Sequence, residues 1–283
     1  MYVRKHLETD WIGFAEMTID SRGDQAVSFK GMKMMRRQQC MRFVLYNIRY
    51  ATGTGWDYHV PFPFWGCFRK TERNFRDISS FLIKLNPDIV GLVESDGGSY
   101  RQNGRSQPKE MASQIGGMSI FSCKYPPESF MTKAPVLKAQ GNAVVTKIPP
   151  LDCDVHYLSY GLKRAFLEVE YEDFVLYLVH LSLRRKTRAK QLEELSRNCL
   201  SAKKPMILAG DYNTFGGEEE LAPFVKKVGL KNANSDCVPT YPSSSPRKLL
   251  DFVLHSPEIK VNNLLIPKVT FSDHLPIVCD FSL

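Results

Sequence analysis

The segment Pro205-Met206-Ile207-Leu208-Ala209-Gly210-Asp211-Tyr212-Asn213-Thr214 decides which fold this chain is expected to adopt. Its first five residues form a short apolar run that is typical of a buried strand, and Gly210 ends that run. Asp211 and Asn213 are therefore expected at the rim of a sheet, on the same side of an extended strand end. Taken alone, Gly-Asp-x-Asn also describes an ordinary turn in which both side chains cap local backbone.

The same arrangement recurs elsewhere in the chain. Four more apolar runs lead directly into one polar residue each: Asn47, Glu94, His180 and Asp251. A further polar cluster, Ser272-Asp273-His274, lies shortly before the C-terminus. Such repetition favours a shared functional site over a set of unrelated turns.

Hydrophobic periodicity predicts helices and strands in alternation. In residues 71–86, apolar side chains recur at three- and four-residue spacing, which is typical of an amphipathic helix, and Asn86-Pro87 ends it. Further helices are predicted at 108–116, 186–201 and 218–228. Strands are predicted at 42–46, 89–93, 119–123, 142–146, 166–171, 174–179, 206–209, 252–255 and 277–281. This alternation indicates the α/β class with mixed strand pairing.

The ordered motifs Asn, Glu, His, Gly-Asp-x-Asn, Asp and Ser-Asp-His resemble those of the endonuclease/exonuclease/phosphatase superfamily of metal-dependent phosphoesterases. The resemblance covers residues 41–283, and Thr240-Tyr241-Pro242 also matches a loop often seen in that family. It implies a four-layer α/β/β/α sandwich with two mixed β-sheets packed face to face. The motifs are then expected to converge at one end of the sheets.

The resemblance also implies a divalent-metal site. Glu94, Asn47 and Asp273 are the expected ligands of Mg²⁺ or Mn²⁺, which prefer hard oxygen donors. A carboxylate at the end of a buried strand is costly unless a charged group meets it, which supports Glu94 as a ligand. The alternative for Glu94 is a surface position or a pair with an arginine such as Arg101.

Catalytic roles are assigned on the same basis. Asp211 is the expected general base or water-positioning acid, and Asn213 would orient the nucleophile or a phosphate oxygen. Asp251 would hold the imidazole of His274 and stabilise its charged form. His180 is expected to donate to a phosphate oxygen, although a lone histidine among aliphatic residues is more often a core residue. His274 remains the alternative base.

Several side chains are expected to bind the substrate phosphate: Asn47, Arg49, Arg164 and Arg184. The Asn-Ile-Arg sequence of residues 47–49 is similar to that of the pancreatic-type deoxyribonucleases. Residues 184–188 place several cations at a helix N-terminus, where the dipole disfavours them. Phosphate binding would compensate this charge, and the alternative is a solvated face. Residues 96–107, rich in glycine with Arg101 and Arg105, are expected to be mobile and to clamp an anion.

Composition agrees with an enzyme that acts on anionic substrates. The net charge is +8, and a positive surface concentrates phosphate esters without distinguishing nucleic acid from lipid headgroups. Residues 56–68 are aromatic and broken by proline; they are expected to stack bases, contact lipid, or pack on the core. Ser95-Asp96 stands where abasic-site endonucleases carry Thr-Lys, which argues against that repair role.

The predicted function is divalent-metal-dependent hydrolysis of phosphate esters by in-line attack of water, with a phosphodiesterase or nuclease favoured. The partner is then a phosphate-ester substrate, with nucleic acid as one option. The alternatives are a lipid or sugar-phosphate phosphodiesterase of the sphingomyelinase type, a phosphomonoesterase, and an inactive binding module on the same fold.

The chain is expected to divide into a poorly ordered N-terminal extension at residues 1–40 and a single endonuclease/exonuclease/phosphatase domain at 41–283. Met41 opens the first convincing strand, and a translation start there is an alternative to a genuine extension. Seven cysteines are spread singly without a targeting signal, which predicts reduced thiols and a cytoplasmic location. No apolar run is long enough to predict stable membrane insertion.

Overall fold

The computed structural model describes residues 40–54, 69–125, 129, 133–134, 136–161 and 164–283. Residues Cys40–Leu283 form one compact unit. Nearly all of the predicted extension at residues 1–40 lies outside the described residues, as does the aromatic segment 56–68.

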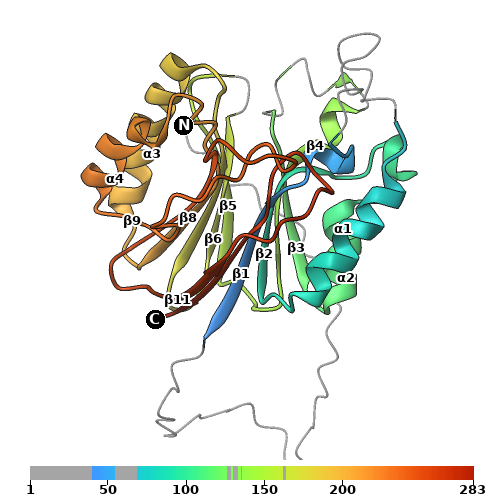
Figure 1. Ribbon diagram of the computed structural model, residues 1–283, viewed down its shortest axis with the longest axis horizontal. Coiled ribbons are helices and arrows are strands. Elements are labelled where there is room, and N and C mark those ends of the chain that lie inside the picture. The colour runs from blue at the N-terminus through green and yellow to red at the C-terminus, as the bar shows by residue number, and fades with distance from the viewer. Residues whose placement is uncertain (1–39, 55–68, 126–128, 130–132, 135, 162–163) are drawn as a thin grey trace, which may run out of the picture. The chain divides into compact units, whose positions relative to one another are not determined.

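Two six-stranded mixed sheets form the centre of this unit (Figure 1). The first has the order β11-β12-β1-β2-β4-β3. Its strands are β1 (Met41–Asn47), β2 (Ile89–Asp96), β3 (Met118–Cys123), β4 (Gln140–Thr146), β11 (Lys260–Leu265) and β12 (Ile277–Ser282). In it, β1 pairs in parallel with β2 and antiparallel with β12.

The second sheet has the order β5-β6-β7-β8-β10-β9. Its strands are β5 (Asp152–Tyr157), β6 (Ala165–Glu170), β7 (Val175–His180), β8 (Met206–Asp211), β9 (Lys231–Asn232) and β10 (Asp251–His255). The central pair β7 and β8 is parallel, and every residue of both strands is buried. Strands covered on both faces are continuously apolar, which explains the uninterrupted runs before His180 and Asp211.

In the part of the chain that the structure describes, four α-helices occur, and they cover the outer faces of the sheets (Figure 1). They are α1 (Glu72–Lys84), α2 (Gln107–Ile115), α3 (Arg185–Ser201) and α4 (Ala222–Val228). Short 3-10 helices occur at Arg49–Ala51, Tyr100–Gln102, Leu137–Ala139 and Glu218–Glu220. The stripe of α1 that contains Phe75, Ile78 and Leu82 packs on the first sheet, as its sequence spacing predicts.

Three apolar clusters correspond to the spaces between four layers. One lies between the sheets and joins residues such as Phe43 and Leu178. A second joins α3 and α4 to the outer face of the second sheet, and the third joins α1 and α2 to the first. The predicted four-layer α/β/β/α sandwich with two mixed sheets is therefore confirmed.

The predicted elements agree with the structure apart from three strands and one helix start. The strands β5, β9 and β11 are not predicted by the sequence, because their side chains are mostly exposed or half-buried and form no apolar pattern. Residues 218–228 form a 3-10 turn followed by α4 and not one helix. The longest described helix is α3, with 17 residues, and no helix in the described ranges has the length and apolar character that a bilayer crossing requires.

Candidate active site

The predicted site residues meet at one edge of the sandwich because their strands end there. Asn47 closes β1 and lies opposite Val93 of the parallel strand β2. His180 closes β7 and lies opposite Asp211 at the end of the parallel strand β8. Asp251 opens the antiparallel strand β10, also opposite Asp211. Parallel neighbours expose their carboxyl ends at the same edge, which brings residues distant in sequence together.

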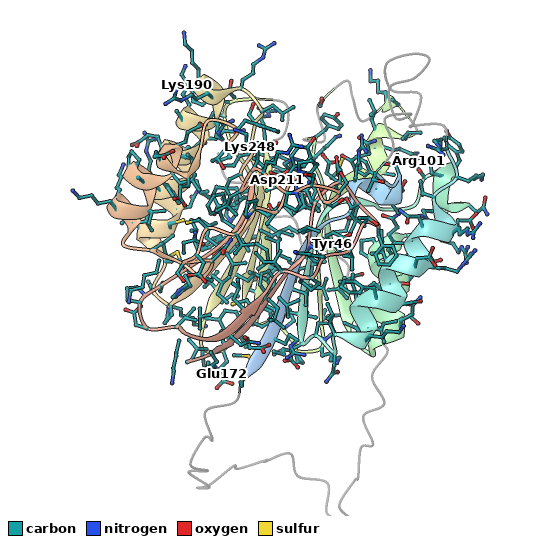
Figure 2. All side chains as sticks on the ribbon, viewed as in Figure 1. Tyr46, Arg101, Glu172, Lys190, Asp211 and Lys248 are labelled. Atoms are coloured by element: carbon teal, nitrogen blue, oxygen red, sulfur yellow. The ribbon has the colours of Figure 1, made fainter. Side chains whose placement is uncertain are left out.

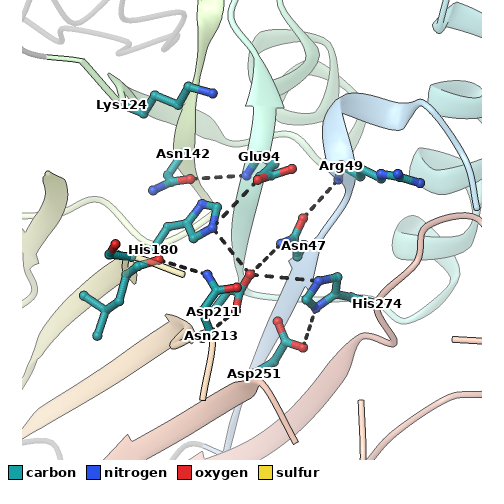
Figure 3. A network of polar contacts seen from close by, with 12 residues as sticks. Asn47, Arg49, Glu94, Lys124, Asn142, His180, Asp211, Asn213, Asp251 and His274 are labelled. Carbon is teal, nitrogen blue, oxygen red and sulfur yellow. Dashed lines mark hydrogen bonds and ion pairs between the residues drawn. The ribbon is translucent and has the colours of Figure 1, made fainter. Parts of the chain in front are cut away.

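The carboxylate of Asp211 is the centre of the site (Figure 3). Its Oδ2 atom accepts a hydrogen bond from Asn47 Nδ2 at 3.0 Å. The same oxygen lies 3.4 Å from His180 Nε2 and 3.9 Å from His274 Nε2. Asp211 is only 2% exposed, so these contacts act with little screening by solvent. One amide and two imidazoles from three parts of the chain thus converge on one oxygen.

Gly210, immediately before Asp211, allows β8 to approach β7 closely. A Cβ atom at this position would lie 2.0 Å from the carbonyl oxygen of Val179, and the φ angle is +152°. Only glycine accepts both the contact and the backbone conformation. The glycine of the Gly-Asp-x-Asn motif therefore places Asp211 beside His180.

Asp251 holds His274 by a short hydrogen bond. His274 Nδ1 lies 2.7 Å from Asp251 Oδ2, which also accepts from Thr240 Oγ1 at 2.6 Å. Burial lowers the pKa of His274, but the carboxylates of Asp251 and Asp211 outweigh it and raise the pKa to about 10. Since Nδ1 is engaged with Asp251, Nε2 is the ring atom that faces Asp211. Figure 3 shows this pair beside Asp211.

Glu94 reaches the site through an irregularity in β2. The pairing of β2 with β4 shifts register between Leu92 and Ser95, and Glu94 has a φ angle of +54°. A positive φ costs a non-glycine residue of order 1–3 kcal/mol and is typical of functional positions. The backbone amide of Glu94 donates to Asn142 Oδ1 at 3.2 Å, and Glu94 Oε1 lies 3.7 Å from His180 Nε2. The bulge directs this carboxylate toward His180.

Asp273 and Arg49 form a pair next to Asn47. Arg49 Nε is 3.4 Å from Asp273 Oδ2, and the Arg49 amide donates to Asn47 Oδ1 at 3.1 Å. Ser272 Oγ donates to the Asn47 carbonyl at 2.7 Å, which ties the Ser-Asp-His segment to the end of β1. Burial raises the pKa of Asp273, and the negative charge of Glu94 adds to that rise while His274 and Arg49 oppose it.

Asn213 adopts a different conformation from the one expected. The strand β8 ends at Asp211, and Asn213 has a φ angle of +54°, so the two residues do not continue an extended strand. The Asn213 amide N–H donates to Asp211 Oδ1 at 2.9 Å, and its Nδ2 donates to the Leu181 carbonyl at 2.9 Å. Asparagine tolerates this left-handed conformation, and the turn links the ends of β7 and β8.

Arg164 and Arg184 are at the margin of the site. Arg164 immediately precedes β6, whose start lies beside the end of β7 because the two strands are antiparallel. Arg184 is exposed at the start of α3. Arg188, one turn further along α3, behaves differently: it is 2% exposed and its Nη2 lies 2.5 Å from Glu220 Oε2. Glu220 therefore compensates the buried charge of Arg188 at this helix start.

The expectation of a mobile anion clamp at residues 96–107 is wrong for its two arginines. Arg101 is fully buried, pairs with Asp96 across 2.9 Å, and stacks on the Tyr50 ring with 5.0 Å to the centroid. Arg105 contacts Glu72 and Glu110. Asp96 also accepts from the Ser99 backbone and hydroxyl. Both guanidinium groups are therefore engaged by carboxylates, and Glu94 is not the partner of Arg101.

The donor set fits a divalent cation. Among the described residues, Asp211, Asp251 and His274 are buried, and one potential ligand atom from each lies within 4.8 Å of the others. This cluster differs from the predicted ligand set of Glu94, Asn47 and Asp273. Asp251 Oδ1 is a buried oxygen that has no hydrogen-bond partner among the described residues. Glu94 and Asp273 add two further carboxylates close enough for the charge of Glu94 to raise the pKa of Asp273. Carboxylate and amide oxygens of this kind suit Mg²⁺ or Mn²⁺.

Three supporting residues received no role in the sequence analysis: Asn142, Thr240 and Ser272. Thr240 belongs to the Thr-Tyr-Pro motif and contacts Asp251, and Ser272 belongs to the Ser-Asp-His motif and contacts Asn47. Both motifs were visible in the sequence and could have indicated these residues. Asn142 lies inside a predicted strand and carries no distinguishing signal. Only the pairing of β2 with β4 brings its side chain to the Glu94 backbone.

A four-layer sandwich with acidic and imidazole side chains gathered at one edge of its sheets defines a recognised class of α/β proteins. The chain belongs to the Endonuclease/Exonuclease/phosphatase family, whose model matches residues 44–274. No curated protein sequence matches the chain. Among solved structures, similar folds occur in an endonuclease/exonuclease/phosphatase from Beutenbergia cavernae (21% identity, TM-score 0.65, 86% of this chain and 72% of that one).

Two further structures have a similar fold and more specific descriptions. The human Nocturnin catalytic domain, solved with a bound sulfate anion, is 22% identical with a TM-score of 0.60 over 86% of this chain and 94% of that one. A mannosyl-6-phosphatase from Bacteroides thetaiotaomicron is 16% identical with a TM-score of 0.61 over 86% and 100%. At identities this low, the similarity to these structures shows a shared fold and nothing further.

Proposed function

We propose that the protein is a divalent-metal-dependent phosphoesterase that cleaves phosphodiesters by in-line attack of water. The observation that carries this proposal is the convergence of Asn47, His180 and His274 on one oxygen of Asp211. A buried carboxylate surrounded by an amide and two imidazoles is suited to accept a proton from water while the neighbouring donors face a phosphate.

Glu94, Asn47 and Asp273 are the proposed metal ligands, with Mg²⁺ or Mn²⁺ as the metal. When bound, the ion would supply positive charge that neutralises the phosphate oxygens and lowers the barrier to attack by an oxygen nucleophile. The acidic character of this side of the site supports the assignment, since burial and the charge of Glu94 both raise the pKa of Asp273. A cation at this position would relieve that repulsion.

The remaining residues act directly on substrate and water. Asp211 accepts the proton of the attacking water, and the Asn213 amide N–H keeps the Asp211 carboxylate oriented. His274, whose charged form is stabilised by Asp251, donates from Nε2 to a phosphate oxygen as negative charge develops. His180 donates to another. We therefore favour Asp211 over His274 as the base, because the contact with Asp251 favours the protonated imidazole.

Arg49, Arg164 and Arg184 are proposed to bind the phosphate groups of the substrate. Arg49 follows Asn47 at the end of β1, Arg164 precedes β6 and Arg184 precedes α3; none of the three is fully buried. Arg49 is the innermost, with its guanidinium 3.4 Å from Asp273. A planar guanidinium can bind two phosphate oxygens at once, which gives orientation as well as charge.

Nucleic acid is the favoured substrate class, and a sugar-phosphate phosphatase is the second candidate. The net charge of +8 supports a polyanionic substrate. The fold shared with a mannosyl-6-phosphatase supports the second candidate. We further propose a cytoplasmic location, because the six cysteines that the structure describes are all free thiols.

A panel of esters tests the proposal. Bis-p-nitrophenyl phosphate, p-nitrophenyl phosphate, plasmid DNA, RNA, sphingomyelin and mannose 6-phosphate are each incubated with Mg²⁺, with Mn²⁺, and with chelator. Chelator-sensitive release from diesters alone is expected. Equal rates with and without chelator, or hydrolysis of monoesters alone, would contradict a metal-dependent phosphodiesterase. Absence of all hydrolysis would favour a binding module.

A further inference from the structure

A row of aromatic rings leads outward from the catalytic imidazole. The Tyr241 ring lies 5.0 Å from the His274 ring, centroid to centroid. The Phe215 ring lies 5.9 Å from Tyr241 in an edge-to-face arrangement with an interplanar angle of 83°. Phe215 is 40% exposed, whereas His274 is 6% exposed. The row therefore begins inside the site and ends at an apolar ring that faces solvent.

The exposed ring of Phe215 is carried by a backbone that is fixed on both sides. The Phe215 amide donates to the Asn213 carbonyl at 2.8 Å, and the Thr214 hydroxyl donates to the Leu249 carbonyl at 3.0 Å. Lys248 Nζ donates to the Phe215 carbonyl at 3.2 Å. Single exposed apolar residues are ordinary on protein surfaces. This one follows directly from the Gly-Asp-x-Asn turn, so the turn that orients Asp211 also positions the ring.

Two cationic side chains lie next to the Tyr241 and Phe215 segments. Lys248 pairs with Tyr241 in an antiparallel bridge, and Arg247 precedes it; both side chains are exposed. Figure 2 shows Lys248 at the same end of the sheets as Asp211, while Glu172 marks the opposite end. A flat apolar ring next to positive charge is the combination that binds bases and phosphates of single-stranded nucleic acids.

We propose that Phe215, backed by Tyr241 and bordered by Lys248 and Arg247, is a stacking subsite for the base of an unpaired nucleotide attached to the scissile phosphate. This subsite presupposes the phosphodiesterase proposed above and narrows its substrate to single strands, chain ends or short oligonucleotides. A base inside a duplex is already stacked on its neighbours and would have to be extruded to reach the ring.

The two cations favour a nucleotide over the other substrate classes. A nucleotide strand brings a second phosphate next to the stacked base, and Lys248 and Arg247 can bind it. A sugar monophosphate has only the phosphate that the catalytic residues bind, so these cations would have no anionic partner on it. A choline headgroup is itself cationic and would be repelled by both side chains.

Matched oligomers separate base stacking from phosphate binding. Pentathymidylate is compared with a pentamer of the same length whose nucleotides are all tetrahydrofuran abasic residues, and the ratio of their kcat/KM values is measured. Phe215→Ala is expected to lower that ratio roughly 5- to 100-fold, since base–aromatic stacking has this strength. Phe215→Trp should preserve this ratio. Leu151, an exposed apolar residue immediately before β5, provides the matched control, and Leu151→Ala should leave the ratio unchanged.

Arg247→Ala tests the cationic border; Lys248 is left in place because its Nζ atom also donates to the Phe215 carbonyl. This change is expected to slow cleavage of both pentamers by the same factor and to reduce their salt dependence, because the phosphates are common to both. The subsite would be overturned by an unchanged kcat/KM ratio in Phe215→Ala or by equal cleavage of paired and unpaired thymidylate. It would also be overturned if Phe215→Ala slowed hydrolysis of sugar phosphate or sphingomyelin alone.

A binding measurement distinguishes failure of the subsite from failure of the catalytic proposal. In Phe215→Trp with chelator present, pentathymidylate is expected to quench the additional tryptophan fluorescence relative to wild type, and the abasic pentamer is not. Quenching without hydrolysis of any ester would keep the subsite and overturn the proposed activity. Hydrolysis of both pentamers without quenching would overturn the subsite and keep the proposed activity. The absence of both quenching and hydrolysis would overturn both proposals.

Discussion

Asn47 Nδ2 donates a hydrogen bond to Asp211 Oδ2 across 3.0 Å, and this contact joins the ends of two strands from different sheets. Asn47 closes β1 of the first sheet, while Asp211 closes β8 of the second. Both side chains are buried, with 2% exposure each. The contact therefore couples the face-to-face packing of the sheets to the orientation of the proposed base.

Replacing Asp211 by asparagine is expected to lower kcat by about 10²–10⁴-fold, the usual contribution of a positioned acid or base. His274→Ala should reduce kcat as well, but through lost stabilisation of developing charge. The pH profiles of kcat distinguish the roles: the pKa of His274, raised to about 10, predicts a fall in kcat on the alkaline side that only the His274 variant should lose. Near-normal turnover of either variant at every pH and metal concentration would remove that residue from the mechanism.

Mg²⁺ or Mn²⁺ is expected to raise the melting temperature of the wild-type protein, and replacing Glu94 by glutamine is expected to abolish that rise. A ligand that binds only the folded state stabilises it by mass action, and the proposed metal site loses its charged ligand in this variant. Differential scanning fluorimetry with a metal titration measures the shift. Glu172→Gln, at the opposite end of the sheets, is the control that should retain it. A full metal shift in Glu94→Gln would contradict the assignment.

Arg188→Ala is expected to destabilise the protein by about 3–5 kcal/mol, because it leaves the Glu220 carboxylate buried without its partner. Arg188 also donates from Nη1 to the Ser182 carbonyl at 2.8 Å, which fixes the segment after His180. Urea unfolding measures the change. Arg185 lies 3.8 Å from the same carboxylate but is 79% exposed, so Arg185→Ala should cost about 0–1 kcal/mol. Equal effects of the two substitutions would refute this distinction.

The Arg42–Asp280 pair links stability to pH. Hydrogen bonding from Arg42 Nε at 2.7 Å lowers the pKa of Asp280, although burial opposes this effect. A lowered folded pKa means that the pair stabilises the protein above the unfolded pKa of about 3.9. The contribution is lost as pH falls through the lower, folded value. The stability difference between wild type and Asp280→Asn should therefore be constant near neutrality and shrink below about pH 4. A difference that grows on acidification would show the opposite linkage.

Residues 41–283 are expected to fold and to retain activity without the preceding segment. The first strand begins at Met41 and is paired on both sides, with β2 and with β12, so residues 41–283 supply both of its neighbours in the sheet. Circular dichroism, thermal unfolding and diesterase rates of the truncated and full chains provide the comparison. A large loss of folding cooperativity or rate in the truncated chain would make residues 1–40 part of the functional unit.

Sequence reasoning located the strands that are buried on both faces and the residues that end them. The apolar runs before Asn47, Glu94, His180 and Asp211 are local patterns, so their strands and their polar ends can be read without a structure. Helix α1 was predictable for the same reason. The exposed edge strands β5 and β11 were not, because their pairing depends on a neighbouring strand and not on an apolar pattern of their own.

The amino-acid sequence by itself determined which residue types are available for chemistry, their order, and the buried strands that carry them. Only the tertiary structure decided which charges face the site and which are neutralised inside the protein. Nothing in the local sequence distinguishes Arg101 and Arg188 from Arg49 and Arg184. In the fold, however, Arg101 is buried against Asp96, and Arg188 is buried against Glu220. Likewise, the bulge at Glu94 and the turn at Asn213 depend on partners in neighbouring strands. These contacts connect residues that are far apart in the chain, and local sequence patterns do not indicate which distant residues come into contact.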